Sequence, residues 1–389
     1  MKRTIAVITT SRADYSHLYW PLRELAAYPE LDLKLIVLGP HLSPEFGCTV
    51  KEIEKDDFRI DARIECLLSS DTDVGMAKTI GIATLGLADC LGSMRPDILL
   101  LTADRYEMLA PASVALALRI PVAHIEGGEL SEGVIDNAVR DALTKLSHIH
   151  FTSTETAKRR VIAMGEEPWR VHRVGAPSLD HLKRSKLRTR AELEEELGLD
   201  LSQPTVLIVY HPATILRDTT AEADALFAAL DCLTEQLIFC YPNSDAGSRV
   251  LIERTRRFLR SHGNARIFIN LHPILYWSLL RCADLLIGNS SSGIMEAASF
   301  AVPVVNIGIR QQGRERARNT LDCEANQDAI LEKIAVAKSR DFRKSLEGME
   351  NPYGDGDAAR RIVQVLGSVP LGMRLLMKRA NDENPTFES

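Results

Sequence analysis

The chain has 389 residues, 45% of them hydrophobic and 26% charged, with a net charge of −6 at pH 7. This length exceeds the roughly 100–200 residues of a typical domain and predicts two domains, while the acidic balance argues against a nucleic-acid partner. The seven cysteines are scattered and form no C-x-x-C pair, which predicts reduced thiols. The N-terminal apolar run is too short for a signal peptide, and no stretch approaches ~20 apolar residues. We therefore expect a cytoplasmic protein without a membrane partner.

Short runs rich in Val, Ile and Leu alternate with longer helical patterns along the chain. Such continuously apolar runs are typical of buried parallel strands, and their alternation with helices predicts an α/β protein with doubly wound sheets. In the first half the predicted strands are 4–9, 33–38, 97–101, 121–125, 149–152 and 170–174. In the second half they are 205–210, 236–241, 265–269, 284–288 and 303–307.

A charged segment, 182–201, followed by Pro204, separates the two series of strands and predicts a surface helix and linker. Further helices are expected at 357–365 and 373–379. The two series predict two Rossmann-like domains, whose facing sheets would create a cleft. Because open α/β sheets bind ligands beyond the carboxyl ends of their strands, the residues just after each strand are the candidates for function.

Polar residues follow two strands of the first half. Arg12, Asp14 and Ser16 come after the first strand, where a helix is expected to begin near Ser16; they suit a phosphate or a sugar, or form a simple helix cap. Asp104 and Arg105 follow a later strand and suit a base with a phosphate clamp, although Asp104 alone could cap a helix.

The segment 124–129 has the sequence His-Ile-Glu-Gly-Gly-Glu. Its two glycines, between Glu126 and Glu129, allow a close approach of the backbone to a ligand, or merely form a turn. The helix that is expected next has Asp136 and Arg140 near its start, where an acidic residue also suits the helix dipole.

In the second half, His211, Asn243 and His272 end strands and could be parts of turns only. The strongest local signal is the run 288–296, Gly-Asn-Ser-Ser-Ser-Gly-Ile-Met-Glu, which joins a strand to a helix. A cap and a packing glycine would explain part of it. Three serines exceed the needs of one cap, so we expect them to bind phosphate at the helix N-terminus, with Glu296 accepting from ribose hydroxyls.

No metal or dinucleotide site is predicted. His148 and His150 share one strand face but lack a nearby carboxylate or Cys, so we expect a structural pair. The chain has no G-x-G-x-x-G, Walker A or G-x-S-x-G motif. We therefore expect neither a metal nor a redox cofactor.

Taken in order, these segments resemble the hydrolysing UDP-N-acetylglucosamine 2-epimerases of sialic acid and related nonulosonic acid biosynthesis. The matching stretches run from Ser11 to about Asp357 and are SRADYS, VLGPHL, ADRYE, HIEGGE, IDNAVRDALTKLSHIH, GAPSLD, HP, YPNSDAGS, IGNSSSGIMEA, PVVNIGIRQQGRE and YGDGDA. The resemblance implies a GT-B-like fold with the UDP-sugar in a cleft between two domains. We expect these domains at 1–178 and 179–366, with a C-terminal helix in 367–389 that crosses back to the first.

The resemblance also implies roles for individual residues. The acids that match catalytic positions are Asp104, Glu126 and Asp136. The residues that match UDP-binding positions are Arg12, Ser16, Arg105, His211, Asn243, His272, Ser290, Ser291, Glu296 and Arg310. His41 and Arg140 match positions on the sugar side, and Glu129 is expected to contact the substrate as well.

Three positions depart from the family pattern and bear on sugar specificity. Ala103 replaces a usual Gly, Asn137 a frequent acid and Asp141 a frequent His. Arg105 and the paired glycines favour the hydrolysing branch over the non-hydrolysing 2-epimerases, which share the fold.

The expected reaction releases UDP and the C2-inverted sugar through a glycal, starting from UDP-N-acetylglucosamine or a 2,4-diacetamido-trideoxy analogue. Removal and delivery of the C2 proton on opposite faces require carboxyls in different environments. The alternatives are a GT-B glycosyltransferase with a UDP-sugar donor and a non-catalytic UDP-sugar-binding regulator. The expected partner is the small-molecule UDP-sugar, and the expected assembly is a homodimer or homotetramer.

Overall fold

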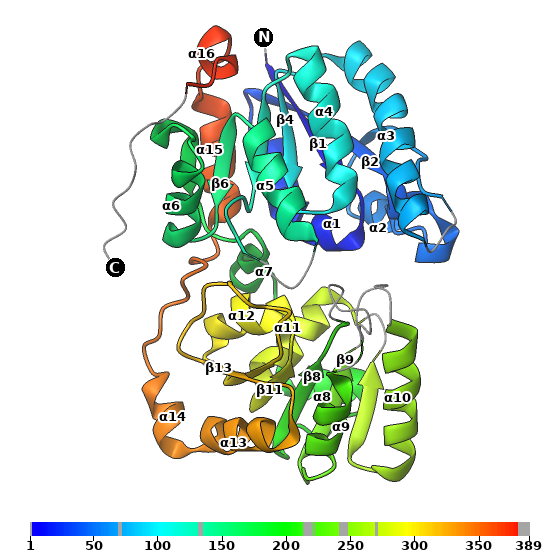
Figure 1. The fold of residues 1–389 in the computed structure, drawn as a ribbon, viewed down its shortest axis with the longest axis vertical. Coiled ribbons are helices and arrows are strands. Elements are labelled where there is room, and N and C mark those ends of the chain that lie inside the picture. The colour runs from blue at the N-terminus through cyan, green and yellow to red at the C-terminus, as the bar shows by residue number, and fades with distance from the viewer. Residues whose placement is uncertain are drawn as a thin grey trace. The chain divides into compact units, whose positions relative to one another are not determined.

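The computed structural model describes residues 2–68, 72–130, 135–212, 220, 222–240, 248–268 and 271–379. It contains two compact units, each built on its own parallel sheet (Figure 1). Unit 1 comprises Met1–Glu129, Asp136–Asp180 and Tyr353–Ser389, and unit 2 comprises Leu130–Ile135 and His181–Pro352. The prediction of an α/β protein with two Rossmann-like sheets is confirmed.

Unit 1 contains a seven-stranded sheet whose strands run parallel in the order β3-β2-β1-β4-β5-β6-β7. The strands are Arg3–Thr9 (β1), Leu31–Leu38 (β2), Ile60–Ile64 (β3), Ile98–Thr102 (β4), Val122–Ile125 (β5), Ile149–Thr152 (β6) and Val171–Arg173 (β7). The strand order reverses between β1 and β4, which is where open α/β sheets bind ligands. The loops after β1, β2, β4 and β5 therefore meet at one edge of the sheet.

Helices cover both faces of this sheet. They are Arg12–Ala27 (α1), Val50–Lys55 (α2), Asp73–Met94 (α3), Leu109–Leu118 (α4), Asp136–Leu146 (α5), Glu155–Ala163 (α6), Ala358–Ser368 (α15) and Met373–Leu376 (α16), with Ser178–Arg184 (α7) at the boundary of the two units. Short 3₁₀ helices are Gly39–Leu42 (η1), Pro44–Phe46 (η2), Tyr106–Met108 (η3) and Pro168–Arg170 (η4).

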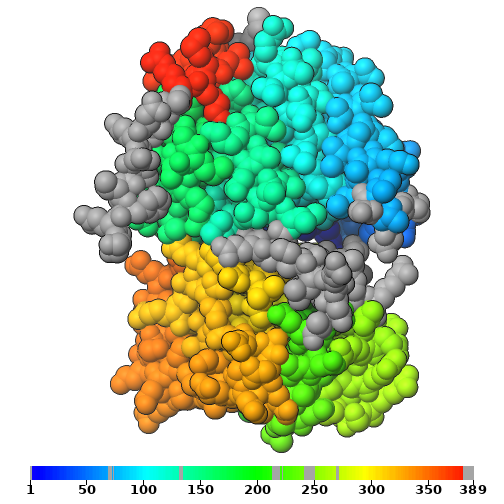
Figure 2. All heavy atoms as spheres, viewed as in Figure 1, coloured from blue at the N-terminus to red at the C-terminus, as the bar shows by residue number. Residues whose placement is uncertain are grey.

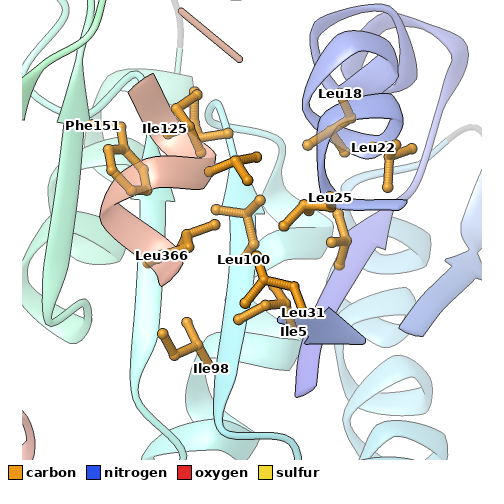
Figure 3. Packing of buried hydrophobic residues seen from close by; sticks show 14 of the residues in the cluster. Ile5, Leu18, Leu22, Leu25, Leu31, Ile98, Leu100, Ile125, Phe151 and Leu366 are labelled. Atoms are coloured by element: carbon orange, nitrogen blue, oxygen red, sulfur yellow. The ribbon is translucent and has the colours of Figure 1, made fainter. Parts of the chain in front are cut away.

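The core of unit 1 lies on both faces of the sheet because β1 points alternate side chains to opposite sides. Ile5 and Val7 pack with side chains of α1 and with Leu366 of α15 on one face (Figure 3). Ala6 and Ile8 pack on the other face with side chains of α3 and α4. Burial on both sides explains why the strand is continuously apolar.

Unit 2 has the same strand order in a six-stranded parallel sheet, β10-β9-β8-β11-β12-β13. The strands are Thr205–Val209 (β8), Gln236–Cys240 (β9), Ala265–Phe268 (β10), Leu285–Gly288 (β11), Val304–Ile307 (β12) and Thr320–Cys323 (β13). The helices are Arg190–Leu197 (α8), Ala223–Leu230 (α9), Ser248–Ser261 (α10), Pro273–Cys282 (α11), Ser291–Met295 (α12), Ala297–Phe300 (η5, 3₁₀), Gln327–Lys338 (α13) and Arg340–Ser345 (α14). Side chains of α9, α10 and α13 pack on one face of the sheet and those of α8 and α11 on the other.

Two strands, β3 and β13, are not predicted from the sequence, and each lies at an edge of its sheet. Most of their residues are half-exposed, including Asp61 in β3, and Asp322 in β13 is exposed. A half-exposed strand has no continuous apolar run, so the pattern that identifies the interior strands is missing. The predicted strands agree with the observed ones within two residues at each end.

The chain returns to unit 1 at Tyr353, upstream of the boundary expected at 367. The carbonyl of Tyr353 accepts a hydrogen bond from the amide of Ala176 at 2.7 Å. The carboxylate of Asp180 accepts from the amides of Ala358 and Ala359, both at 2.9 Å, and so holds the start of α15. Because the apolar face of α15 also belongs to the core of unit 1, this helix is part of unit 1.

Within α3, the segment Val74–Met94 is long and apolar enough to cross a membrane by length and composition, with a mean hydropathy of 1.4. It is the one such helix in the part of the chain that the structure describes. The expectation that no stretch approaches a membrane span is therefore wrong. The segment was overlooked in the sequence because Lys78 and Asp89 interrupt its apolar residues. Leu87 and Leu91 on its inner side pack in the core of unit 1.

Candidate active site

The loop between β1 and α1 is fixed by Asp14, which accepts hydrogen bonds from the amides of Thr10 and Ser11, both at 2.6 Å. Ser11 is the N-cap, so α1 begins at Arg12 and not near Ser16 as the sequence predicts. Arg12 and Ser16 are half-buried near the start of this helix. Asp14 is buried and performs the capping role that the sequence left open.

His41 follows β2 and is fully buried. Its Nε2 lies 2.9 Å from the hydroxyl of Thr9, and its Nδ1 lies 2.7 Å from the hydroxyl of Thr49. Burial lowers the pKa of His41 although Asp14 opposes this effect, so the ring is neutral at pH 7. With both ring nitrogens engaged, His41 supports the loop after β1, and its contact with a sugar stays a prediction.

Asp104 follows β4 and forms an ion pair with Arg140 of α5. Arg140 is buried and also donates to the carbonyl of Glu129 at 2.9 Å. The residue before Asp104, Ala103, has a φ of +58°, in the left-handed region that favours glycine. The strained turn and the ion pair together fix the direction of the Asp104 carboxylate.

Arg105 is held by the carboxylate of Glu107, with Nε 3.2 Å from one oxygen and Nη2 2.8 Å from the other. Glu107 is fully buried. Burial by itself lowers the pKa of Arg105, but the adjoining Glu107 carboxylate outweighs that effect and raises the pKa. Arg105 is therefore a charged guanidinium in a fixed position, which suits a phosphate oxygen.

Glu126 follows β5 and is buried, with a φ of +66° in the left-handed region. Its amide donates to the carbonyl of Phe151 at 2.8 Å. Its carboxylate Oε1 lies 2.9 Å from Nδ1 of His17 in α1. A strained backbone and a hydrogen-bonded side chain thus hold this carboxylate beside the loop after β1.

The two glycines after Glu126 are explained by packing within unit 1. A Cβ on Gly128 would lie 2.4 Å from the carbonyl of Ala157 in α6. A Cβ on Gly127 would lie 3.0 Å from the hydroxyl of Thr144 in α5. The close approach at this turn is therefore between the turn and two helices, and the glycines need no ligand to explain them.

Asp136 is half-buried in the first turn of α5, one turn before Arg140. Since Arg140 binds Asp104 and the Glu129 carbonyl, it connects α5 to the ends of β4 and β5. His124 lies in β5, and its Nε2 lies 2.8 Å from the carbonyl of Ala103. Burial lowers the pKa of His124 to about 4. The three expected catalytic acids thus lie on segments that follow two adjacent strands.

In unit 2, Asn289 joins the ends of β8 and β11. Its side chain accepts from the amide of His211 at 2.7 Å and donates to the carbonyl of His211 at 2.8 Å. A Cβ on Gly288 would lie 2.0 Å from a backbone oxygen of β8, so this approach requires glycine. Arg310 and Gln311, after β12, donate to the Asn289 carbonyl at 3.1 and 2.9 Å.

The serine run lies at the start of α12. The hydroxyl of Ser290 accepts from the amide of Ser292 at 3.3 Å and caps the helix. The hydroxyl of Ser292 in turn bonds that of Tyr276 on α11. Because α11 begins directly after the exposed His272, this hydrogen bond brings the helix that carries His272 against the serine run.

Of the other expected UDP-binding residues of unit 2, Ser291, Glu296 and His211 lie close by in the fold. Ser291 opens α12, and Glu296, which is buried, directly follows it. Burial, with a smaller contribution from Arg310, lowers the pKa of His211 far below its usual value, so this ring is neutral. Asn243 lies outside the described residues.

Four residues that support the site are not predicted from the sequence: His17, Glu107 and Asn289, which contact expected site residues, and Gln311, which contacts Asn289. Each lies one or two positions from a predicted site residue, and that proximity was the available signal. Their roles depend on partners, and those of His17, Asn289 and Gln311 come from distant parts of the chain.

Among the residues that the structure describes, no group of three or more His, Cys, Asp or Glu could hold a metal ion. His148 and His150 make hydrogen bonds within unit 1, and a carboxylate lies beside His150 although none was expected there from the sequence. Nδ1 of His148 accepts from the amide of Val122 at 3.1 Å, and Nε2 of His150 lies 3.1 Å from Glu166.

Known proteins are similar to this chain over most of its length. Residues 23–367 match the family described as UDP-N-acetylglucosamine 2-epimerase. The chain is 39% identical to the UDP-N,N'-diacetylbacillosamine 2-epimerase (hydrolyzing) of Legionella pneumophila, over 97% of this chain and 99% of that protein. It is 37% identical to the GDP/UDP-N,N'-diacetylbacillosamine 2-epimerase (hydrolyzing) of Campylobacter jejuni, over 88% of this chain and 90% of that protein.

Solved structures show the same fold. The UDP-GlcNAc 2-epimerase of Neisseria meningitidis, bound to UDP-GlcNAc, matches with a TM-score of 0.79 and 19% identity over 93% of this chain and 99% of that one. The Methanocaldococcus jannaschii enzyme in complex with UDP-GlcNAc and UDP matches with a TM-score of 0.76 at 19% identity and the same coverage. The resemblance stated from the sequence is confirmed: the chain belongs to the UDP-N-acetylglucosamine 2-epimerase family, in its hydrolysing branch.

Proposed function

We propose that this enzyme hydrolyses a UDP-linked 2,4-diacetamido-trideoxyhexose and releases UDP and the free sugar inverted at C2. The observation that carries the reaction is the placement of Asp104, Glu126 and Asp136 after adjacent strands of unit 1, beside Arg105 and Arg140. The two relatives described above act, by their names, on UDP-N,N'-diacetylbacillosamine, which favours the diacetamido sugar. UDP-N-acetylglucosamine is the second candidate substrate.

The chemistry explains why several carboxylates are needed. The C2 proton of a 2-acetamido sugar is not acidic, so its removal must be coupled to the departure of UDP from C1. One carboxylate takes the proton as the C1–O bond breaks, which leaves a glycal. Water then adds at C1 while a second acid delivers a proton to the opposite face of C2.

Asp104 and Glu126 suit these two opposite roles because their surroundings differ. Asp104, ion-paired with the guanidinium of Arg140, suits the base. Glu126, hydrogen-bonded to the imidazole of His17 and not to a guanidinium, suits proton delivery. Asp136, one turn before Arg140, completes the acidic set.

The polar groups of unit 2 support a site for the nucleotide. The serine run from Ser290 offers hydroxyls and amides at a helix start, where phosphates bind. Arg310 supplies a cation for the diphosphate, and Glu296 suits the ribose hydroxyls. Neutral His211 is available to the base or the phosphate. In unit 1, Arg12, Ser16 and Arg105 are proposed to bind phosphate, and Glu129 and His41 to contact the sugar.

Incubation of the enzyme with each UDP-sugar in D₂O, followed by NMR, tests the proposal. We expect free UDP and a reducing, C2-inverted sugar that carries deuterium at C2, with a higher kcat/KM for the diacetamido substrate. Turnover should persist in EDTA and need no NAD. A product still linked to UDP, or one that retains the original hydrogen at C2, would contradict the reaction.

We further propose a cytoplasmic role in the supply of sugars for sialic or related nonulosonic acids. The support is the family, whose hydrolysing members produce free C2-inverted amino sugars, and the reduced cysteines expected of such a compartment. The enzyme is proposed to act as a homodimer or homotetramer.

A further inference from the structure

An open groove of about 400 Å³ lies beside β7, the strand at one edge of the sheet of unit 1. Residues of α6, β7 and α15 line it, and the segment that contains α6 forms part of the visible surface of unit 1 (Figure 2). The polar residues that line the groove are Lys158, His172, Arg173, Arg361, Gln364 and Ser368. A groove of this volume accommodates a small molecule.

Positive charge gathers in this groove although the chain as a whole is acidic, with a net charge of −6. The cationic residues come from three different elements: Lys158 from α6, Arg173 from β7 and Arg361 from α15. No Asp or Glu is among the described residues that line the groove. Cations that converge from separate elements repel one another, and a bound anion removes that cost.

Arg361 and Lys158 differ in the contacts that they already make. Arg361 donates to the carbonyl of Val174 at 3.0 Å and forms two hydrogen bonds of 2.8 Å with the carboxylate of Asp355. These contacts join α15 to the end of β7 and fix the guanidinium in place. Lys158 is half-buried and forms no ion pair with any residue that the structure describes. Its ammonium group is therefore available to an anion in the groove.

His172 adds a hydrogen-bond donor to the groove. Its ring packs near that of Phe151, with the centroids 6.0 Å apart, and no described residue hydrogen-bonds its ring nitrogens. Burial lowers the pKa of His172, and the positive charge of Lys158 and the neighbouring His150 lower it further. The ring is therefore neutral at pH 7 and carries one N–H group.

We propose that this groove is a second binding site of the enzyme, which takes a small molecule with a phosphate group. Lys158 and Arg173 bind phosphate oxygens, and the ring N–H of His172 donates to another. A phosphate group carries about 1.5 to 2 negative charges at pH 7 and three strong acceptor oxygens, so it suits several donors better than a carboxylate does. Gln364 and Ser368, both exposed on α15, offer an amide and a hydroxyl to the rest of the molecule.

The groove is separate from the candidate active site. In the sheet, β6 lies between β7 and β5, the strand that Glu126 follows. Because neighbouring strands are about 4.8 Å apart, β7 lies roughly 10 Å from β5. The proposal therefore adds a second ligand and needs no assumption about the reaction. A nucleic acid is the wrong class of ligand, since the acidic balance of the chain disfavours a long polyanion.

NMR of the full-length protein provides the test, with ¹³C-labelled histidine rings and the signal of His172 assigned by its loss in His172→Gln. Glucose 6-phosphate is the probe. It should shift the His172 signal saturably and raise the pKa of His172 by about one unit, because a bound dianion favours the protonated ring. Inorganic phosphate should cause the same shift but bind more weakly, since it lacks the part that contacts Gln364 and Ser368. Glucose should cause no saturable shift, and acetate should bind roughly tenfold more weakly than phosphate.

Substitutions identify the residues that bind the phosphate. Lys158→Gln and Arg173→Gln should each raise the Kd for glucose 6-phosphate by roughly tenfold, because each removes a charged hydrogen bond. Arg159→Gln is the matched control and should leave the Kd unchanged, since Arg159 is exposed on the same helix as Lys158 and does not line the groove. Circular dichroism should be the same for these three variants.

Two results overturn the proposal: the lack of a saturable shift of the His172 signal, and a Kd that Lys158→Gln and Arg173→Gln leave unchanged. Acetate that binds as tightly as phosphate excludes a phosphate ligand and overturns it as well. The readout is local to His172, so failure of the proposed reaction would not affect the result.

Discussion

At the scale of the residue, the expected catalytic acids and the expected nucleotide-binding residues have different surroundings. Asp104 and Glu126 follow strands β4 and β5 of unit 1, where Arg140 and His17 contact their carboxylates. Ser290 and Glu296 flank α12 of unit 2, in a loop that Asn289 ties to the sheet. Groups that transfer protons and groups that hold the nucleotide give different kinetic defects when they are removed.

We expect Asp104→Asn, Glu126→Gln and Asp136→Asn to lower kcat by roughly 10²–10⁴-fold, because each removes an acid or base and keeps the shape of the side chain. UDP binding measured by calorimetry should stay nearly normal, and circular dichroism checks the fold. Near-normal turnover in these carboxamide variants would show that the catalytic assignment is wrong.

For the residues expected to bind the nucleotide, we expect a change in KM and not in kcat. Ser290→Ala and Glu296→Ala should raise KM and weaken UDP binding in calorimetry with little change in kcat, because they remove contacts shared by the bound substrate and the transition state. If either variant bound UDP as the wild type does, its place in the nucleotide site would have to be abandoned.

His17 is expected to act as a positioning residue for Glu126. His17→Phe removes the hydrogen bond at 2.9 Å and should lower kcat by roughly tenfold or more at nearly constant KM. His17→Gln, whose amide can still donate to the carboxylate, should recover part of that loss. Equal Tm values would exclude a purely structural effect, whereas full activity in His17→Phe would contradict the role.

At the scale of the element, the C-terminal segment is clamped to unit 1. The guanidinium of Arg170 donates to the carbonyls of Leu375 at 2.7 Å and Met377 at 2.9 Å. Lys378 reaches the buried carboxylate of Glu166 at 2.9 Å, which also accepts from Lys145 at 2.6 Å. Buried charges that are paired in this way are costly to break.

Glu166 should make this clamp sensitive to acid. Burial alone raises the pKa of Glu166, but hydrogen bonds from His150, Lys145 and Lys378 outweigh it and lower the pKa to about 2. A lowered carboxyl pKa adds stability that is present above the usual pKa of about 4.5 and is lost as the pH falls toward 2.

We therefore expect Glu166→Gln to reduce the free energy of unfolding by on the order of 3 kcal/mol at pH 7. The difference in the free energy of unfolding between this variant and the wild type should narrow as the pH falls from 4.5 toward 2. Urea denaturation across this range measures it, with the exposed Glu347→Gln as a matched control. A gap that does not depend on pH would contradict the assigned pKa.

At the scale of the whole molecule, neutral histidines are buried in both units. Burial lowers the pKa of His124 and of His148 in unit 1 to about 4, and it lowers the pKa of His211 in unit 2 well below its usual value. The unfolded chain binds protons at these sites near pH 6.5, whereas the folded chain does not.

The native state should consequently lose stability as the pH falls below about 6.5, since the unfolded state takes up more protons. Each of His124 and His148 should contribute up to roughly 2 kcal/mol of this loss between pH 6.5 and 5. Urea denaturation at pH 7, 6 and 5 measures the slope, and His124→Asn should reduce it. A free energy of unfolding that stays constant over this range would refute the prediction.

The sequence by itself determined the features that depend on local pattern. Strands with both faces buried must be apolar at every position, so the interior strands were predictable from their composition. The carboxyl ends of such strands meet at one edge, so polar residues after them were predictable as site candidates, Asp104 and Glu126 among them. Ordered similarity over the chain then indicated the family and its reaction.

Only the tertiary structure decided the features that depend on distant partners. The edge strands β3 and β13 are recognised by pairing, since their half-exposed side chains follow no apolar pattern. The return of the chain at Tyr353 depends on hydrogen bonds from α15 to Asp180. The ion pair of Arg140 with Asp104 and the contact of His17 with Glu126 join residues far apart in the sequence. Local sequence carries no record of such pairs, because their energies arise only when folding brings the partners together.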